Sequence, residues 1–235
     1  MPPTKRAPKP PKINLLTAAR RVTKTIPFAP DGPFDMDIAP GAEKFMVVTG
    51  QNASGKSLFV KLLGAQTMQA KNAPTVVSVS IRERTGGGFR AAFMFGDEAE
   101  QSTGATSVGT VVNAFEHNTD RPEGSVLVLD EPELGLSEGY SIAMGTYIGQ
   151  KVAALSGACS GVILVTHSRP LVQAAVDAYG ATPTHVALGQ RAGLSSWLTS
   201  VEQRTVDELL GLREVGLERW RWTMRAVREA KAGNG

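Results

Sequence analysis

The chain has 235 residues, 42% of them hydrophobic, and carries 25 basic against 22 acidic residues. This length suits one α/β domain with a sizeable core. No run approaches the roughly 18 apolar residues of a membrane span, and the first residues lack the apolar segment of a secretory signal, so we expect a cytoplasmic protein without a membrane span. The single cysteine, Cys159, excludes an internal disulfide and a cysteine-based metal site, and we expect it in a loop or at a helix end.

Basic charge is concentrated near the N-terminus. Residues 1–30 hold seven Lys or Arg and no acidic residue, whereas the other 18 basic residues accompany 22 acidic ones. Residues 1–12 combine five prolines with four basic side chains, a composition typical of an extended segment. We expect a flexible basic arm over 1–12 and a single domain over 13–235. The arm either contacts nucleic acid or an acidic partner, or only solubilises the chain.

The first elements of the domain are short. Residues 13–25 predict a short helix or strand that ends before two prolines. Residues 34–38 alternate apolar and acidic side chains, which predicts a half-exposed strand, and Pro40-Gly41 turns the chain into the next strand.

A glycine-rich loop follows the apolar run 45–48. The stretch fits the phosphate-binding pattern G-x-x-x-x-G-K-[ST] at every fixed position: Gly50, Gln51, Asn52, Ala53, Ser54, Gly55, Lys56, Ser57. Its backbone N–H groups and the positive end of the following helix suit anionic oxygens. Lys56 offers a charge for β and γ phosphates, and Ser57 a hydroxyl ligand for Mg²⁺. A glycine turn without a ligand is the alternative.

The middle of the chain predicts β-structure and then a helix. Residues 75–81 and 89–95 predict a hairpin or a pair of strands joined by three glycines. A polar stretch then leads to a helix over 108–117. The hydroxyl-rich Ser102-Thr103 lies where that helix would begin, as a cap or as an anion-binding site.

Two continuous apolar runs, 125–129 and 161–165, predict strands that are buried on both faces. The first ends in Asp130-Glu131 and the second in Thr166-His167-Ser168. Because parallel strands end at one edge of a sheet, the loops after Val48, Leu129 and Val165 should meet there. At that edge Asp130 would hold Mg²⁺, Glu131 would orient an attacking water, and His167 would sense the γ phosphate. His117 and His185 have no such setting.

The remaining elements complete an α/β pattern. We expect helices over 138–152 and 170–176, a strand over 185–188, and two C-terminal helices within 201–232 that are separated near 211–216. The predicted fold is a mainly parallel central sheet flanked by helices, with an added antiparallel β element.

These motifs together resemble the ATP-binding-cassette-type ATPase head of the P-loop NTPase superfamily. The loop 50–57 is similar to the superfamily's phosphate loop, and residues 126–132 to its hydrophobic strand with an Asp-Glu-Pro ending. Gly135-Leu136-Ser137 resembles its loop at the dimer seam, and Thr166-His167-Ser168 its switch histidine. The resemblance covers residues 34 to 175. The short interval from Ser57 to Ser102 and residues 96–103 look more like MutS-type heads than like transporter subunits. Residues 130–137 together with 166–168 resemble RecF- and SMC-type heads.

The resemblance implies hydrolysis of ATP with Mg²⁺ by an ATP-dependent homodimer. Because the hydroxyl-rich helix start at Ser102 and Thr103 suits phosphate, we expect these residues of one chain to meet the γ phosphate held by Lys56 of the other. Such a head would drive a nucleic-acid-maintenance or defence-type complex through a nucleic-acid or protein partner. The alternatives are an ATP-hydrolysing subunit of a membrane transporter and a nucleotide-binding scaffold with negligible turnover. Adenine would stack on Phe28 or Phe34 unless both pack in the core. The superfamily also has a glutamine loop, for which Gln66 and Gln69 are candidates only because of their order along the chain.

Overall fold

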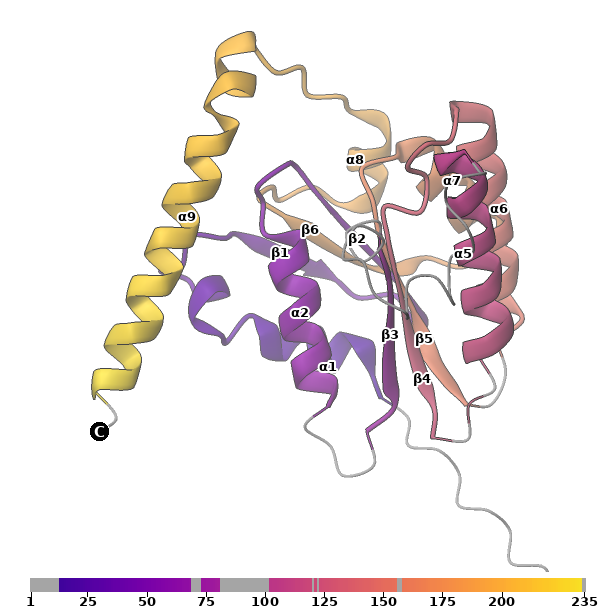
Figure 1. The fold of residues 1–235 in the computed structure, drawn as a ribbon, viewed down its shortest axis with the longest axis horizontal. Coiled ribbons are helices and arrows are strands. Elements are labelled where there is room, and N and C mark those ends of the chain that lie inside the picture. Colours follow the sequence, from indigo (N-terminus) through magenta and orange to yellow (C-terminus); the bar gives the residue numbers. More distant parts are fainter. Residues whose placement is uncertain are drawn as a thin grey trace, which may run out of the picture.

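A six-stranded sheet forms the centre of the molecule, in the order β1-β6-β2-β5-β4-β3 (Figure 1). The computed structural model describes residues 13–68, 73–80, 102–119, 121, 123–155 and 158–233. The strands are β1 (Met36–Ala39), β2 (Ala42–Gly50), β3 (Thr75–Ser80), β4 (Ser125–Asp130), β5 (Cys159–Val165) and β6 (Pro183–Leu188).

The sheet is parallel except at one edge. Strands β6, β2, β5, β4 and β3 run parallel, whereas β1 pairs antiparallel with β6, with Met36 opposite Leu188. The mainly parallel sheet is therefore confirmed. The strand expected over 34–38 is β1, and it pairs with β6. The strand expected from residue 75 is β3, which pairs in parallel with β4; its proposed partner, 89–95, lies outside the described residues.

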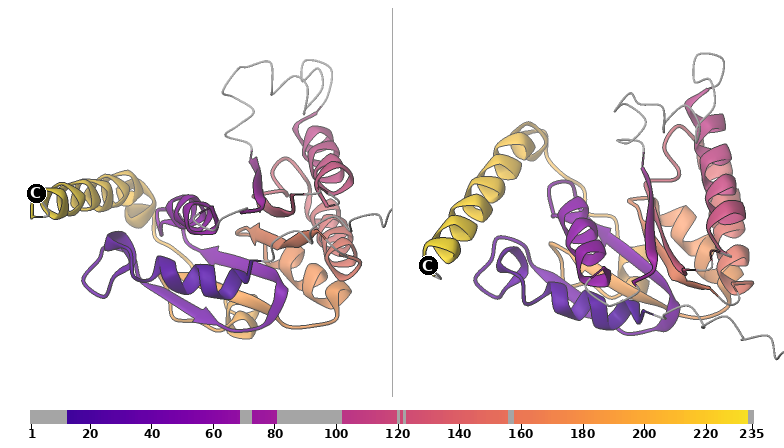
Figure 2. Two further views of the ribbon diagram at one scale, coloured as in Figure 1. Left: turned by 90° about the horizontal axis from the view of Figure 1, so that it is seen from below. Right: turned by 60° about the horizontal axis from the view of Figure 1, so that its bottom comes forward.

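Helices cover both faces of the sheet. They are α1 (Leu15–Val22), the 3₁₀ turn η1 (Ile26–Phe28), α2 (Lys56–Thr67), α5 (Thr103–Asn118), α6 (Glu138–Ala153), α7 (Arg169–Tyr179), α8 (Leu194–Thr199) and α9 (Val206–Gly233). Figure 2 shows α1 and α2 on one face and α5, α6 and α7 on the other, with α9 at the far side of the molecule from α5 and α6. No helix within the described residues combines the length and apolarity that crossing a bilayer requires.

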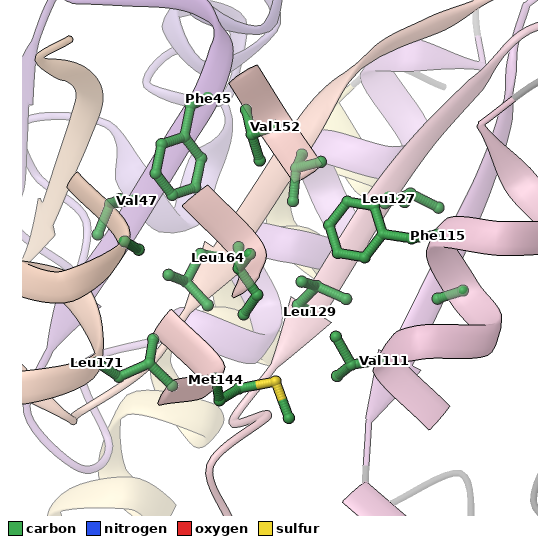
Figure 3. Close-up of a cluster of buried hydrophobic side chains, with 14 of the residues drawn as sticks. Phe45, Val47, Val111, Phe115, Leu127, Leu129, Met144, Val152, Leu164 and Leu171 are labelled. Carbon is green, nitrogen blue, oxygen red and sulfur yellow. The ribbon is translucent and has the colours of Figure 1, made fainter. Parts of the chain in front are cut away.

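Alternating strand residues build two cores. Phe45, Leu127 and Leu164 face α5, α6 and α7 and pack with Met144 and Leu171 (Figure 3). Their neighbours along the strands point to the opposite face and pack against α1 and α2: Met46, Val48, Val126, Val128, Ile163 and Val165. Both faces of the central strands are thus buried, which explains why the sequence there is continuously apolar.

Helices α6 and α7 pack closely because α6 presents glycines to α7. A Cβ at Gly145 would lie 2.2 Å from the Leu171 carbonyl oxygen, and one at Gly149 would lie 2.3 Å from that of Ala175. Ser168 caps α7 by accepting a hydrogen bond from the Leu171 N–H, and its Oγ lies 3.1 Å from Ser141 Oγ on α6. This packing fixes the start of α7, directly after His167.

Two sequence predictions are wrong. The C-terminal region contains one continuous helix of 28 residues, α9, rather than two helices separated near 211–216. Each glycine in a helix costs only about 1 kcal/mol relative to alanine, and this is too little to end a long helix that contains no proline. The helix begins at a reciprocal capping box, in which the Thr205 N–H donates to Glu208 and the Glu208 N–H donates to Thr205.

The second wrong prediction concerns Cys159, which was expected in a loop or at a helix end. Cys159 lies buried in β5, because pairing with β4 extends that strand toward the N-terminus.

Candidate functional site

Residues 50–57, the glycine loop, connect the end of β2 to the start of α2. Gly50 has a φ of 153° and Gly55 a φ of 95°. A Cβ at Gly50 would lie 2.6 Å from the Leu188 carbonyl oxygen, and one at Gly55 would lie 2.7 Å from the Phe34 ring. Glycine is therefore required at both positions, both for its backbone conformation and for space.

Lys56 is held inside the curve of this loop. Its Nζ donates hydrogen bonds to the carbonyl oxygens of Gly50 and Gln51, each at 3.0 Å. Lys56 also begins α2, whose first N–H groups have no acceptors within the helix. A cation and the positive end of a 12-residue helix thus point into the same space, which suits an anion.

The acidic side of the site begins where β4 ends. Asp130 is the last residue of β4, and the Glu131 N–H donates to the Val165 carbonyl oxygen at 2.8 Å. Glu131 has a φ of 52° and Ala53 of the glycine loop a φ of 60°, the two non-glycine residues with positive φ in the described part of the chain. Such conformations cost about 1–3 kcal/mol each and cluster at functional sites.

His167 lies beside Glu131. Its Nε2 is 3.5 Å from Glu131 Oε1. Burial, together with the positive charge of Lys56, lowers the pKa of His167 below its usual value of 6.5, although the Glu131 carboxylate acts in the opposite direction. At pH 7 the ring is therefore neutral and carries one N–H donor.

A buried hydrogen-bond network supports His167 from behind. Thr166 Oγ1 donates to Glu133 Oε1 and accepts from the Ser168 N–H at 2.8 Å. Burial raises the pKa of Glu133, and its second carboxyl oxygen is buried without a hydrogen-bond partner. The network ties the turn after Glu131 to the turn that carries His167. No local pattern in the sequence around Glu133 indicates its contact with Thr166, so its role could not be predicted.

A cleft of about 660 Å³ brings these groups together. It is lined by Lys56, Ser57, Asp130, Glu131 and His167, among others. The loops that follow β2, β4 and β5 therefore meet, as the parallel arrangement predicts. Asn52, Ala53, Ser54 and Gly55 of the glycine loop also line this cleft, while Gln51 faces a second cleft of about 790 Å³ and donates to Glu202.

The cleft also contains two oxygen-bearing side chains, Asp130 and Ser57, of the kind that can bind a magnesium ion. Within the described ranges, no cluster of three or more His, Cys, Asp or Glu could hold a metal alone. Mg²⁺ commonly takes one or two protein oxygens and completes its coordination with phosphate oxygens and water. The Asp130 carboxylate and the Ser57 hydroxyl, which line the same cleft, are ligands of that kind.

Of the remaining sequence candidates that the structure describes, Phe34 lines the cleft, and Phe28, Gln66, Ser102 and Thr103 do not. Ser102 and Thr103 are exposed at the start of α5, where Ser102 Oγ accepts a hydrogen bond from the Ala105 N–H and so acts as the expected cap. Gln66 lies on α2 and lines neither cleft, and Gln69 falls outside the described residues. Phe28 and Phe34 are buried with ring centroids 5.3 Å apart, so the alternative of core packing is correct for both.

The C-terminal helix α9 supplies a wall of the cleft that the sequence did not indicate. Gly216, Arg219, Trp220 and Thr223 line it, at helical spacing along one side of α9. Arg219 Nη1 donates to the Ala53 carbonyl oxygen at 2.6 Å. The helix that projects from the body in Figure 1 is thus joined to the glycine loop.

Comparison of the chain with protein-family models finds no match, and comparison with curated proteins finds none.

Proposed function

We propose that the chain is a Mg²⁺-dependent ATPase, a P-loop NTPase of the ATP-binding-cassette head type. The observation that carries this proposal is the single cleft at the carboxyl edge of a parallel sheet, where Lys56 lies together with Asp130, Glu131 and His167. These groups lie at or after the ends of three strands, β2, β4 and β5. Their combination matches the needs of phosphoryl transfer: a cradle for phosphates, a metal ligand and a group that orients water.

Binding begins with the glycine loop. Lys56 exchanges its two carbonyl acceptors, Gly50 and Gln51, for β and γ phosphate oxygens. The phosphate oxygens carry negative charge whereas the carbonyl oxygens are neutral, so the Lys56 ammonium gains charge attraction in this exchange, which favours the bound state. Asp130 and Ser57 would hold Mg²⁺, which neutralises charge shared by the β and γ oxygens.

Hydrolysis then needs an oriented water. Its oxygen forms a bond to the γ phosphorus while the bond from that phosphorus to the bridging oxygen of the β phosphate breaks, which gives ADP and inorganic phosphate. Glu131 accepts a hydrogen bond from this water and takes its proton as the new bond forms. His167 lies 3.5 Å away and is neutral at pH 7, so it adds a donor without neutralising Glu131 in an ion pair.

We further propose that ATP joins two copies of the chain. Ser102 and Thr103 are exposed at the start of the 16-residue helix α5, where hydroxyls and helix N–H groups suit phosphate. Gly104 packs against the Gly135 carbonyl oxygen, within the turn that follows Glu131. Through this contact, the nucleotide of a second copy, bound at Ser102 and Thr103, would act on the turn that follows Asp130 and Glu131. A role of the dimer in nucleic-acid maintenance or defence is proposed from motif resemblance alone.

Calorimetric titration of Mg·ATP into the full chain tests the proposal. Lys56→Ala should weaken binding by about 10- to 100-fold, the effect of losing a hydrogen bond to a charged group. Lys24→Ala removes an equal charge from an exposed position outside the cleft and should leave the affinity unchanged. Absence of ATP binding to the wild-type chain, or equal affinities for all three proteins, would refute the proposal.

A further inference from the structure

Besides His167, two aromatic side chains line the cleft among its described residues, Phe34 and Trp220, and of these two only Trp220 is exposed. Phe34 is 8% exposed. Phe28 packs against its ring, the Arg219 guanidinium lies 5.7 Å from its centroid, and Gly55 leaves no space beside it. No nucleobase can stack on a ring enclosed in this way.

Trp220 differs in exposure although it lines the same cleft. It is 57% exposed, which leaves a large apolar ring system in water next to the glycine loop. Stacking a nucleobase on an aromatic side chain contributes about 1–3 kcal/mol by alanine substitution, and every base has a suitable face. Stacking on a planar aromatic ligand therefore stabilises the exposed Trp220 indole more than the enclosed Phe34 ring.

The backbone around Trp220 is held in place by its neighbours on α9. Arg219 donates to the Ala53 carbonyl oxygen, and Gly216 faces Ala53, where a Cβ would lie 3.9 Å from the Ala53 side chain, in ordinary van der Waals contact. Thr223 is buried and donates to the Arg219 carbonyl oxygen at 2.9 Å. Such fixing reduces the entropy that ligand binding would otherwise cost.

We propose that Trp220 stacks on the base of the nucleotide whose phosphates the glycine loop holds, and that Arg219 is the residue that positions α9 for this contact. This inference rests on the proposed function and extends it, because it assigns the nucleoside end of the ligand to the C-terminal helix. Trp220 then favours nucleoside triphosphates over inorganic polyphosphate. The same contact couples nucleotide binding to the docking of α9.

The test compares two ligands that share phosphates and differ in the base. Mg·ATP and Mg·tripolyphosphate are titrated calorimetrically into the full chain and into Trp220→Ala, Trp220→Phe and Leu210→Ala. Trp220→Ala should weaken ATP binding by about 5- to 100-fold and leave tripolyphosphate binding unchanged. Trp220→Phe keeps a stacking face and should retain most of the ATP affinity. Leu210, 75% exposed on the same helix and outside both clefts, is the control and should change neither affinity.

The outcomes separate this inference from the function on which it rests. If the wild-type chain binds neither ligand, both are refuted. If ATP binds the wild-type chain and Trp220→Ala equally well, or if Trp220→Ala weakens both ligands alike, the stacking role is wrong while the phosphate site stands. For Arg219, the ATP affinity lost in Arg219→Ala should shrink in a Trp220→Ala background, and equal losses in both backgrounds would overturn its positioning role.

Discussion

Mild acid should destabilise the folded chain through one buried imidazole. His185 in β6 is 2% exposed, and its Nε2 lies 2.8 Å from Thr49 Oγ1. Burial lowers the pKa of His185 from 6.5 to about 4, although the Asp37 carboxylate raises it. Between these two pH values the unfolded chain binds a proton that the folded chain does not. Stability present above pH 6.5 is therefore lost as the pH falls toward 4.

The size of this loss follows from the two pKa values. One pKa unit corresponds to about 1.4 kcal/mol, so the full effect of His185, reached below pH 4, is about 3 kcal/mol. At pH 5 the folded ring is still mostly neutral and the unfolded ring mostly charged, and the loss relative to pH 7 is about 2 kcal/mol. This is a large share of the 5–15 kcal/mol that commonly stabilises a domain.

Urea unfolding at pH 7 and pH 5 measures the effect. His167 and the carboxyl groups also titrate, so the informative quantity is the pH dependence of the wild-type chain minus that of His185→Gln. This difference should be about 2 kcal/mol. The control, His117→Gln, removes an exposed imidazole and should keep the wild-type pH dependence. Equal pH dependence in His185→Gln and the wild-type chain would show that the imidazole is not buried in a neutral form.

Three further predictions concern packing, assembly and the N-terminal arm. In urea unfolding, Gly145→Ala should destabilise the chain by about 1–3 kcal/mol because the new Cβ would meet the Leu171 carbonyl oxygen. A Cβ at Gly139 in the same helix meets nothing, so Gly139→Ala should be neutral or slightly stabilising, and equal effects of the two variants would refute the close packing of α6 on α7. Light scattering should show that Glu131→Gln dimerises with Mg·ATP and not with ADP, and that adding Ser102→Arg abolishes the dimer. A monomeric mass of Glu131→Gln with Mg·ATP at high protein concentration would contradict a nucleotide bound between two copies. Deleting residues 1–12 should lower nucleic-acid affinity and flatten its salt dependence without changing ATP turnover, and an unchanged salt titration would leave the arm a solubilising segment.

The sequence predicted the elements whose patterns are local. The continuous apolar runs that became β4 and β5 indicate strands buried on both faces, and such strands occur in parallel sheets. The glycine loop and the acidic ending of β4 are also local patterns, so the convergence of Lys56, Glu131 and His167 followed once parallel order was assumed. Cys159 was misplaced because its strand conformation depends on the register with β4.

The contribution of α9 was not predictable for the same reason. Arg219 and Ala53, which share a hydrogen bond, are separated by 166 positions in the sequence. Nothing in the local pattern of α9 indicates that Trp220 lines the cleft, and its glycines suggested a break where the helix continues. Tertiary contacts place Trp220 at the cleft, whereas the helix continues because its glycines cost too little to end it.

A single-turnover experiment tests the central claim most directly. The full chain and Glu131→Gln are each mixed with a limiting amount of Mg·ATP, and the bound nucleotide is analysed over time. The wild-type chain should convert bound ATP to ADP. Glu131→Gln should bind ATP but convert it at least about 100-fold more slowly, since it lacks the group that orients and deprotonates water. Equal rates of ADP formation in the two proteins, or ATP that stays unhydrolysed in the wild-type chain, would contradict the assignment of this cleft as an ATPase site.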